Sequence, residues 1–113
     1  MDRKIRALET QIATIKQQLL SLGDLRPGSL SRQYNVCGNP TCRCKESPPR
    51  KHGPYYQLSF TRKGRSSTAF VKKPHVARVR KHLKNYARLR TLIDRWIELS
   101  TELCKLKTEQ ETA

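Results

Sequence analysis

The chain has 113 residues, of which 35% are hydrophobic, and its 24 Lys and Arg outnumber 9 Asp and Glu to give a formal net charge of +15. This length predicts one domain, 1–113, with a single small core, and the absence of any run of 18 apolar residues excludes a transmembrane helix. The N-terminus has no apolar secretory segment, so we expect a cytoplasmic protein that does not bind membranes.

The first segment, 1–24, has apolar residues at alternating spacings of three and four, which predicts a heptad helix that needs a partner helix. Gly23 is expected at the C′ position that ends this helix near Leu22, and Pro27 prevents its continuation. The stripe consists of Ile5, Leu8, Ile12, Ile15, Leu19 and Leu22.

The middle segment, 26–73, has the period-two pattern of strands. Residues 55–62 alternate so that Tyr56, Leu58 and Phe60 share one face, Lys63-Gly64 forms a tight turn, and residues 65–72 return as a second strand. Residues 30–36 are expected to form a third strand. Such a small antiparallel sheet of two or three strands needs reinforcement.

A cluster of cysteines precedes this hairpin. Cys37, Cys42 and Cys44 are followed by His52 in the spacing C-x4-C-x-C-x7-H, and three Cys with one His are a common ligand set of structural Zn²⁺. Without a secretory signal, clustered thiols are more typical of a metal site than of disulfides. We expect one structural zinc ion, with His75 or water as alternatives to His52. Cys104 is expected to be a small buried apolar residue.

A long helix is predicted over 74–110, because no glycine or further proline follows Pro74. Its apolar stripe changes phase near residues 86–92, which suggests a stutter or a bend. The first part holds Val76, Val79, Leu83 and Tyr86, and the second holds Leu92, Trp96, Leu99, Leu103 and Leu106. The second part can pair with 1–24 as an antiparallel coiled coil, and a homodimer with a four-helix bundle is also possible. The predicted class is therefore α+β, with the zinc-stabilised sheet between two helices.

The positive charge is concentrated in the middle of the chain. Residues 26–90 hold 17 Lys and Arg against one acid, Glu46, whereas residues 1–25 have a net charge of +1 and residues 91–113 a net charge of −2. Self-repulsion of such charge opposes folding, and its confinement indicates a surface for phosphate backbone. The alternative is a merely solvated basic surface.

Nucleic-acid contacts are expected at the zinc loop, the hairpin tip and the first half of the long helix. The predicted contact residues are Arg43, Lys45, Arg50, Lys51, Tyr55, Gln57, Arg62, Lys63, Arg65, Lys72, Lys73, Arg78, Arg80, Lys81 and Lys84. Tyr55 is expected to face outwards, where it either stacks on an unpaired base or packs against its surroundings, and Tyr34 has the same two options. RNA and single-stranded DNA therefore stay open as alternatives to duplex DNA.

Three strings of residues resemble a group of small, uncharacterised prokaryotic proteins that are often encoded beside transposases and other mobile elements. They are Pro27-Gly-Ser-Leu-Ser-Arg32, Cys37-Gly-x-Pro-x-Cys42-x-Cys44, and His52-Gly-Pro-Tyr-Tyr-x-Leu-Ser59 with Gly64-Arg65. The resemblance covers residues 26–100 and implies a genomic context, with a transposase or recombinase as a possible partner, rather than an activity. The His52 string with its basic turn is also similar to sheet modules that bind DNA in integrase-type proteins, which is an analogy of fold.

These features predict a non-enzymatic nucleic-acid-binding protein, with DNA favoured over RNA, that is an accessory factor of a mobile element. The alternative is an assembly protein whose coiled-coil arms bind a partner while the basic middle docks an acidic surface. An enzyme is disfavoured, because two-metal phosphodiester chemistry needs clustered carboxylates and residues 25–93 hold only Glu46. Tyr86 has the surroundings of a recombinase nucleophile but lies on the apolar stripe.

Overall fold

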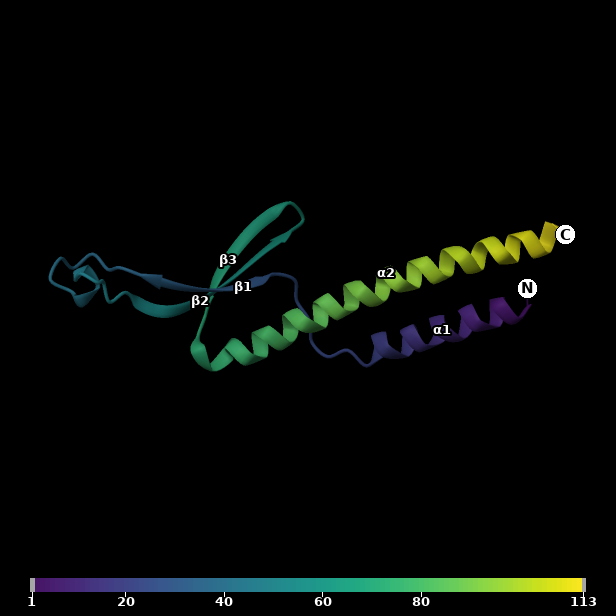
Figure 1. Ribbon diagram of the computed structural model, residues 1–113, viewed down its shortest axis with the longest axis horizontal. Coiled ribbons are helices and arrows are strands. Elements are labelled where there is room, and N and C mark those ends of the chain that lie inside the picture. Colours follow the sequence, from purple (N-terminus) through teal and green to yellow (C-terminus); the bar gives the residue numbers. More distant parts are fainter. Residues whose placement is uncertain (1, 113) are drawn as a thin grey trace. The chain divides into compact units, whose positions relative to one another are not determined.

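The computed structural model describes residues 2–112, which form two α-helices and three β-strands (Figure 1). In chain order these are α1 (Asp2–Leu20), β1 (Ser29–Asn35), a 3₁₀ turn (Arg43–Lys45), β2 (His52–Arg62), β3 (Arg65–Val71), a second 3₁₀ turn (Lys73–His75) and α2 (Val76–Thr112). The predicted α+β class is confirmed. No helix in the described part of the chain is long and apolar enough to cross a membrane.

The chain divides into two compact units. The first unit joins the residues up to Leu25 with those from Lys84 onwards, and the second unit is Arg26–Leu83. Helix α2 is unbroken through residues 86–92 and contributes to both units. Val76 and Val79 are buried residues of its first part, whereas Leu92 belongs to the apolar cluster of the first unit. The phase change in the stripe therefore coincides with a change of packing environment along one continuous helix.

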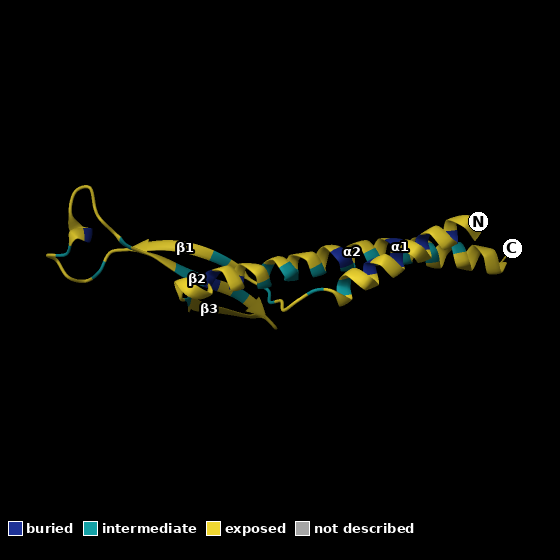
Figure 2. Ribbon diagram, turned by 90° about the horizontal axis from the view of Figure 1, so that it is seen from below, coloured by how far each residue is buried: buried dark blue, intermediate teal, exposed yellow. Residues whose placement is uncertain are grey.

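The core of the first unit is an apolar cluster shared by α1 and the second part of α2. The two helices run antiparallel, with the N- and C-termini at the same end (Figure 1). Both helices carry buried residues, drawn in dark blue (Figure 2). The cluster contains Leu8, Ile12, Ile15, Leu92 and Leu99, with Leu19, Leu22, Trp96, Leu103 and Leu106 packed against it. The apolar stripes predicted for the first helix and for the second part of the long helix thus supply the residues that pack in this cluster.

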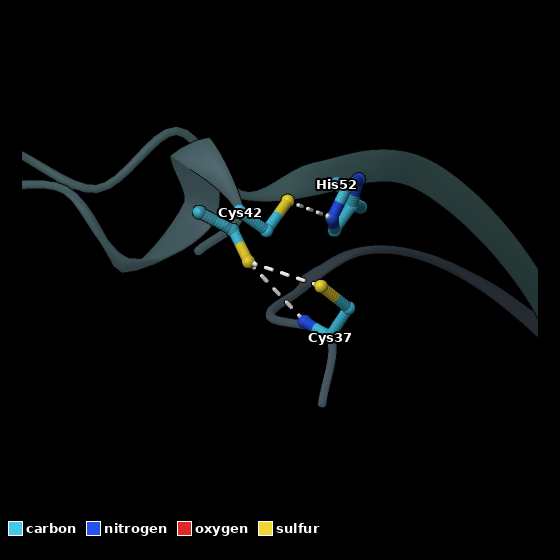
Figure 3. A group of neighbouring side chains, drawn as sticks. Cys37, Cys42 and His52 are labelled. Atoms are coloured by element: carbon cyan, nitrogen blue, oxygen red, sulfur yellow. Dashed lines mark hydrogen bonds between the residues drawn. The ribbon is translucent and has the colours of Figure 1, made fainter. Parts of the chain in front are cut away.

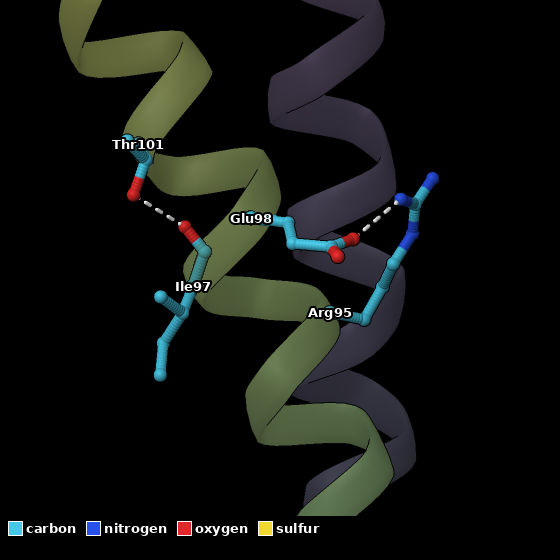
Figure 4. A network of polar contacts seen from close by, with 4 residues as sticks. All are labelled: Arg95, Ile97, Glu98 and Thr101. Atoms are coloured by element: carbon cyan, nitrogen blue, oxygen red, sulfur yellow. Dashed lines mark hydrogen bonds and ion pairs between the residues drawn. The ribbon is translucent and has the colours of Figure 1, made fainter.

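Ion pairs flank this cluster. The Lys4 ammonium lies 3.2 Å from a Glu102 carboxylate oxygen, and the Lys107 ammonium lies 4.0 Å from Glu9. On α2 itself an Arg95 guanidinium nitrogen lies 3.1 Å from Glu98 (Figure 4). Exposed pairs of this kind contribute little stability. Two of them nevertheless connect opposite charges on the two helices.

The end of α1 and the position of Cys104 differ from the sequence predictions. Helix α1 ends at Leu20 rather than near Leu22, and Gly23 does not have the positive φ of a C′ glycine. Instead, the Asn85 side-chain amide donates to the Asp24 carbonyl at 2.8 Å, so a tertiary contact holds the segment after the helix. Cys104 is exposed rather than buried, because it follows Leu103 and lies outside the stripe that packs on α1.

The second unit contains an antiparallel sheet in the order β1-β2-β3. All three predicted strands are present, and β2 begins at His52, before the predicted start at residue 55. Arg62 pairs with Arg65 across the two-residue turn, in which Lys63 has φ 52° and Gly64 has φ 77°. Positive φ at both central residues defines the type I′ turn, whose twist suits a hairpin.

Few apolar side chains are buried in the second unit. They are Cys44, Leu58, Val76 and Val79. The chain before β1 passes closely over β2, because a Cβ atom on Gly28 would lie 2.8 Å from the Ser59 carbonyl oxygen. Only glycine permits this approach, which also occurs at a φ of 135°. The sheet thus has a thin core beside Leu58.

Candidate metal centre and sheet surface

The loop between β1 and β2 carries the cysteine cluster. The cross-strand pair Asn35–His52 closes the sheet at this end, so the loop begins and ends close to His52. Asn39 shapes the loop, since its side-chain oxygen accepts hydrogen bonds from the Thr41 backbone and hydroxyl at 3.1 and 2.8 Å. The Asn39 carbonyl accepts from the Cys42 backbone, and the 3₁₀ turn that follows contains Cys44.

The four predicted ligands lie together. The ligand atoms of Cys37, Cys42, Cys44 and His52 are all within 4.8 Å of one another. Cys42 Sγ points at His52 Nε2 at 3.1 Å, and Cys37 Sγ lies 3.5 Å from Cys44 Sγ (Figure 3). Around a tetrahedral zinc ion with Zn–S bonds near 2.3 Å, sulfur atoms lie about 3.8 Å apart. The group is therefore close enough to hold one metal ion.

The thiols of the group are not equivalent. Hydrogen bonding to the Asn39 backbone lowers the pKa of Cys37, and hydrogen bonds with the Cys44 and Cys42 thiols lower it further. Burial raises the pKa of Cys44, whose residue is only 1% exposed. Cys37 is thus the first of these two thiols to ionise. A bound cation would stabilise the thiolate forms of the remaining ligands.

The fourth position of the group is occupied by His52. The alternative ligand His75 lies in the second 3₁₀ turn and is not part of the group. Among the described residues, the group contains no carboxylate. Three sulfur atoms and one imidazole nitrogen match a structural zinc set, in which protein ligands fill all four positions.

The predicted basic contact residues are exposed. This holds for all thirteen Lys and Arg of the predicted set. Of these thirteen, only Arg50 forms an ion pair with another described residue, at 3.7 Å from Glu46 and with both side chains largely exposed. The second unit holds 14 Lys and Arg against this one acid, a net charge of +13. Its basic side chains are therefore not neutralised by neighbouring acids.

Strand alternation gives the sheet two different faces. Leu58 is 1% exposed and marks one of them, which also includes Tyr56 and Phe60. Tyr55 is on the opposite face and is 43% exposed, as expected from its position next to Tyr56. We call this opposite face the Gln57 face. There the Gln33 side-chain amide donates to Gln57 Oε1 at 2.7 Å.

Gln33 and Phe70 of the Gln57 face are not among the predicted contacts. Phe70 is 73% exposed and lies opposite Gln57 in the pairing of β2 with β3. Gln33 contacts Gln57 from β1, on the other side of β2. The sequence held the necessary signal, because the tight turn at Lys63-Gly64 fixes the register that pairs residue 57 with residue 70.

Tyr34 is 48% exposed, and a Cβ on Gly53 would lie 2.9 Å from its ring. The Tyr34 ring therefore packs over the backbone of β2.

Tyr55 and Phe70 line two adjacent hollows. The first has a volume of about 250 Å³ and is also lined by Asn35, Val36, Cys37 and His52. The second has a volume of about 230 Å³ and is also lined by Pro54, Tyr56, Val71, Lys72 and Lys73. One aromatic pair thus lies between the metal-ligand group and two lysines.

Comparison with known proteins gives a family but no characterised relative. No curated protein and no solved structure matches the chain. The family that does match covers residues 5–81, which include most of α1, the whole sheet and all four residues of the metal-ligand group. The chain therefore belongs to the family described as domain of unknown function (DUF6788).

Proposed function

We propose that the protein binds nucleic acid through its second unit, and that one zinc ion held by Cys37, Cys42, Cys44 and His52 stabilises that unit. The convergence of these four ligand atoms within 4.8 Å supports the metal site. Binding of a structural zinc ion contributes roughly 10 kcal/mol in small domains. Such a contribution would compensate for the thin core and for the repulsion among basic residues.

The charge distribution is the observation that supports nucleic acid as the ligand. A net charge of +13 on one unit, with a single ion pair among its described residues, leaves its Lys and Arg available for phosphate. Phosphate contacts supply most of the sequence-independent affinity for DNA and release counterions. We favour DNA over RNA, with no catalytic step.

Three further parts of this proposal concern the context of binding. We infer that α1 and the second part of α2 form an antiparallel coiled-coil arm, because their heptad stripes supply the shared apolar cluster. This arm would also suit a homodimer. The resemblance to proteins encoded beside mobile elements leads us to propose a transposase or recombinase as the partner.

The test is the salt dependence of DNA affinity, together with elemental analysis of the purified protein. We expect about one zinc per chain and binding of labelled DNA that weakens steeply between about 50 and 200 mM salt. The triple variant Arg62→Ala/Lys63→Ala/Arg65→Ala should weaken binding and make the log–log salt slope shallower by up to about three.

A charge-matched control separates a surface contact from a general effect of net charge. The triple variant Arg3→Ala/Arg6→Ala/Lys105→Ala removes three exposed basic residues from the first unit. We expect it to retain the salt slope of the unmodified protein. A DNA affinity that does not change with salt would contradict the proposed surface, and so would equal losses of DNA affinity in the two triple variants.

A further inference from the structure

The Gln57 face carries no charge, although it belongs to the most basic part of the protein. Strand register places ten uncharged residues on it: Ser29, Ser31 and Gln33 of β1, Tyr55, Gln57, Ser59 and Thr61 of β2, and Ser66, Thr68 and Phe70 of β3. Side-chain hydrogen bonds agree with this assignment. The Gln33 side-chain amide donates to Gln57 Oε1 at 2.7 Å, and the hydroxyl oxygens of Thr61 and Ser66 lie 3.0 Å apart. The face is therefore built from hydroxyls, amides and two aromatic rings.

This face is open to solvent. Gln57 is half-buried, and the other nine residues are exposed. Phe70, at 73%, is exposed more than the other aromatic residues of the sheet, whereas Leu58 on the opposite face is 1% exposed. A ring at this position gains little from packing within the unit. Together with Tyr55 it forms an exposed aromatic pair beside polar amides.

The surroundings of the aromatic pair include basic groups on one side. Lys72 and Lys73 line the same hollow of about 230 Å³ as Tyr55 and Phe70. An ammonium group beside an aromatic ring suits a nucleotide, because the base can stack on the ring while its phosphate pairs with the lysine. The neutral centre of the face offers no comparable contact to phosphate.

We propose that the Gln57 face binds the bases of single-stranded DNA, with Tyr55 and Phe70 as stacking platforms and Lys72 and Lys73 as phosphate contacts. This inference rests on the proposed function and specifies the strand state of the ligand. A duplex presents its phosphates and keeps the faces of its bases stacked inside, so it cannot use exposed rings. Unpaired bases can stack on the rings, and the Gln33–Gln57 amide pair can hydrogen-bond to their edges.

The experiment compares three probes at one fixed salt concentration by fluorescence anisotropy. The probes are an oligothymidylate of about 12 nucleotides, an abasic strand with the same number of phosphates, and a duplex of the same length. Because the abasic strand keeps the charge and lacks the bases, it isolates the stacking contribution. We expect the oligothymidylate to bind most tightly.

The variants are Phe70→Ala and Tyr55→Ala, with Ser67→Ala as an exposed control on the same strand as Phe70 but on the opposite face of the sheet. Each aromatic variant should weaken oligothymidylate binding between about fivefold and a hundredfold and leave the abasic strand unaffected. Ser67→Ala should change neither affinity by more than about twofold. Because Phe70 is so exposed, its variant keeps the test valid even if Tyr55→Ala disturbs the sheet; metal content and thermal melting check the fold.

The outcomes distinguish this inference from the proposed function. Selective loss of oligothymidylate binding in Phe70→Ala supports the stacking face. If duplex and oligothymidylate bind equally and Phe70→Ala changes neither, the stacking face is wrong while nucleic-acid binding stands. If no probe binds, both proposals are wrong. An oligouridylate of the same length serves as a further probe, and its tighter binding than that of the oligothymidylate would overturn the assignment to DNA.

Discussion

The two units of this protein are stabilised in different ways. The first unit has an apolar cluster with residues from two helices, and it contains ion pairs between those helices, Lys4–Glu102 and Lys107–Glu9. The second unit has few buried apolar side chains, one ion pair and a group of four potential metal ligands. Burial can stabilise the first unit, whereas the second needs another source of stability.

Under the proposed function, this difference separates stability from nucleic-acid binding within one short chain. A net charge of +13 on the second unit costs free energy through repulsion, and its thin core offsets little of that cost. A metal ion stabilises a fold without covering its surface with apolar groups. With such an ion bound, as we propose, the second unit can expose basic and aromatic residues that a purely hydrophobic core would not support.

Removal of the metal is expected to change the stability of the second unit more than any other change considered for the two units. Chelation, or Cys44→Ser, should unfold the sheet and abolish the proposed nucleic-acid binding, because the second unit then loses the metal ion that we propose stabilises it. Amide hydrogen exchange should show lost protection in β1, β2 and β3 and retained protection in α1. Cys104→Ser, at an exposed position, is the control and should change neither nucleic-acid binding nor the hydrogen-exchange protection of the sheet. Equal loss of protection in both units would show that they do not differ in this way.

Truncation of the helical core tests the opposite side of the comparison. Leu99 is 5% exposed, so Leu99→Ala should destabilise the first unit by about 2–5 kcal/mol. Unfolding can be followed by the fluorescence of Trp96, which packs against the same cluster. Ile97→Ala, at a position 58% exposed, is the matched control on the same helix and should cost less than about 1 kcal/mol. Loss of bound metal in Leu99→Ala would contradict the separation of the two units.

The hairpin turn offers a smaller test, confined to the second unit. Gly64 has φ 77° and open space around its would-be Cβ, so Gly64→Ala adds backbone strain without a clash. The expected cost is about 1–2 kcal/mol. Gly38→Ala is the control, because Gly38 also has open space and lacks the positive φ. Comparable melting of the two metal-loaded variants would show that the turn conformation is not required.

Sequence patterns predicted those parts of the protein that depend on nearby residues. The spacing of Leu8, Ile12 and Ile15 identified the packed side of α1, and the alternation around Leu58 identified the covered side of β2. The four-residue metal-ligand group was also predicted, because three thiols within eight residues and a histidine after a proline-rich turn are brought together locally. In each case the pattern extends over one element or one loop.

Tertiary contacts decided what these patterns left open. They determined that Asn85 holds the chain after α1 in place of a Gly23 cap, that His52 rather than His75 joins the thiols, and that Cys104 is exposed. Strand register placed Phe70 beside Gln57, and the division into two units gave α2 two packing environments. Periodicity is a local property that shows which side of an element is apolar. The partner of that side depends on contacts between residues distant in the chain, which only the folded structure specifies.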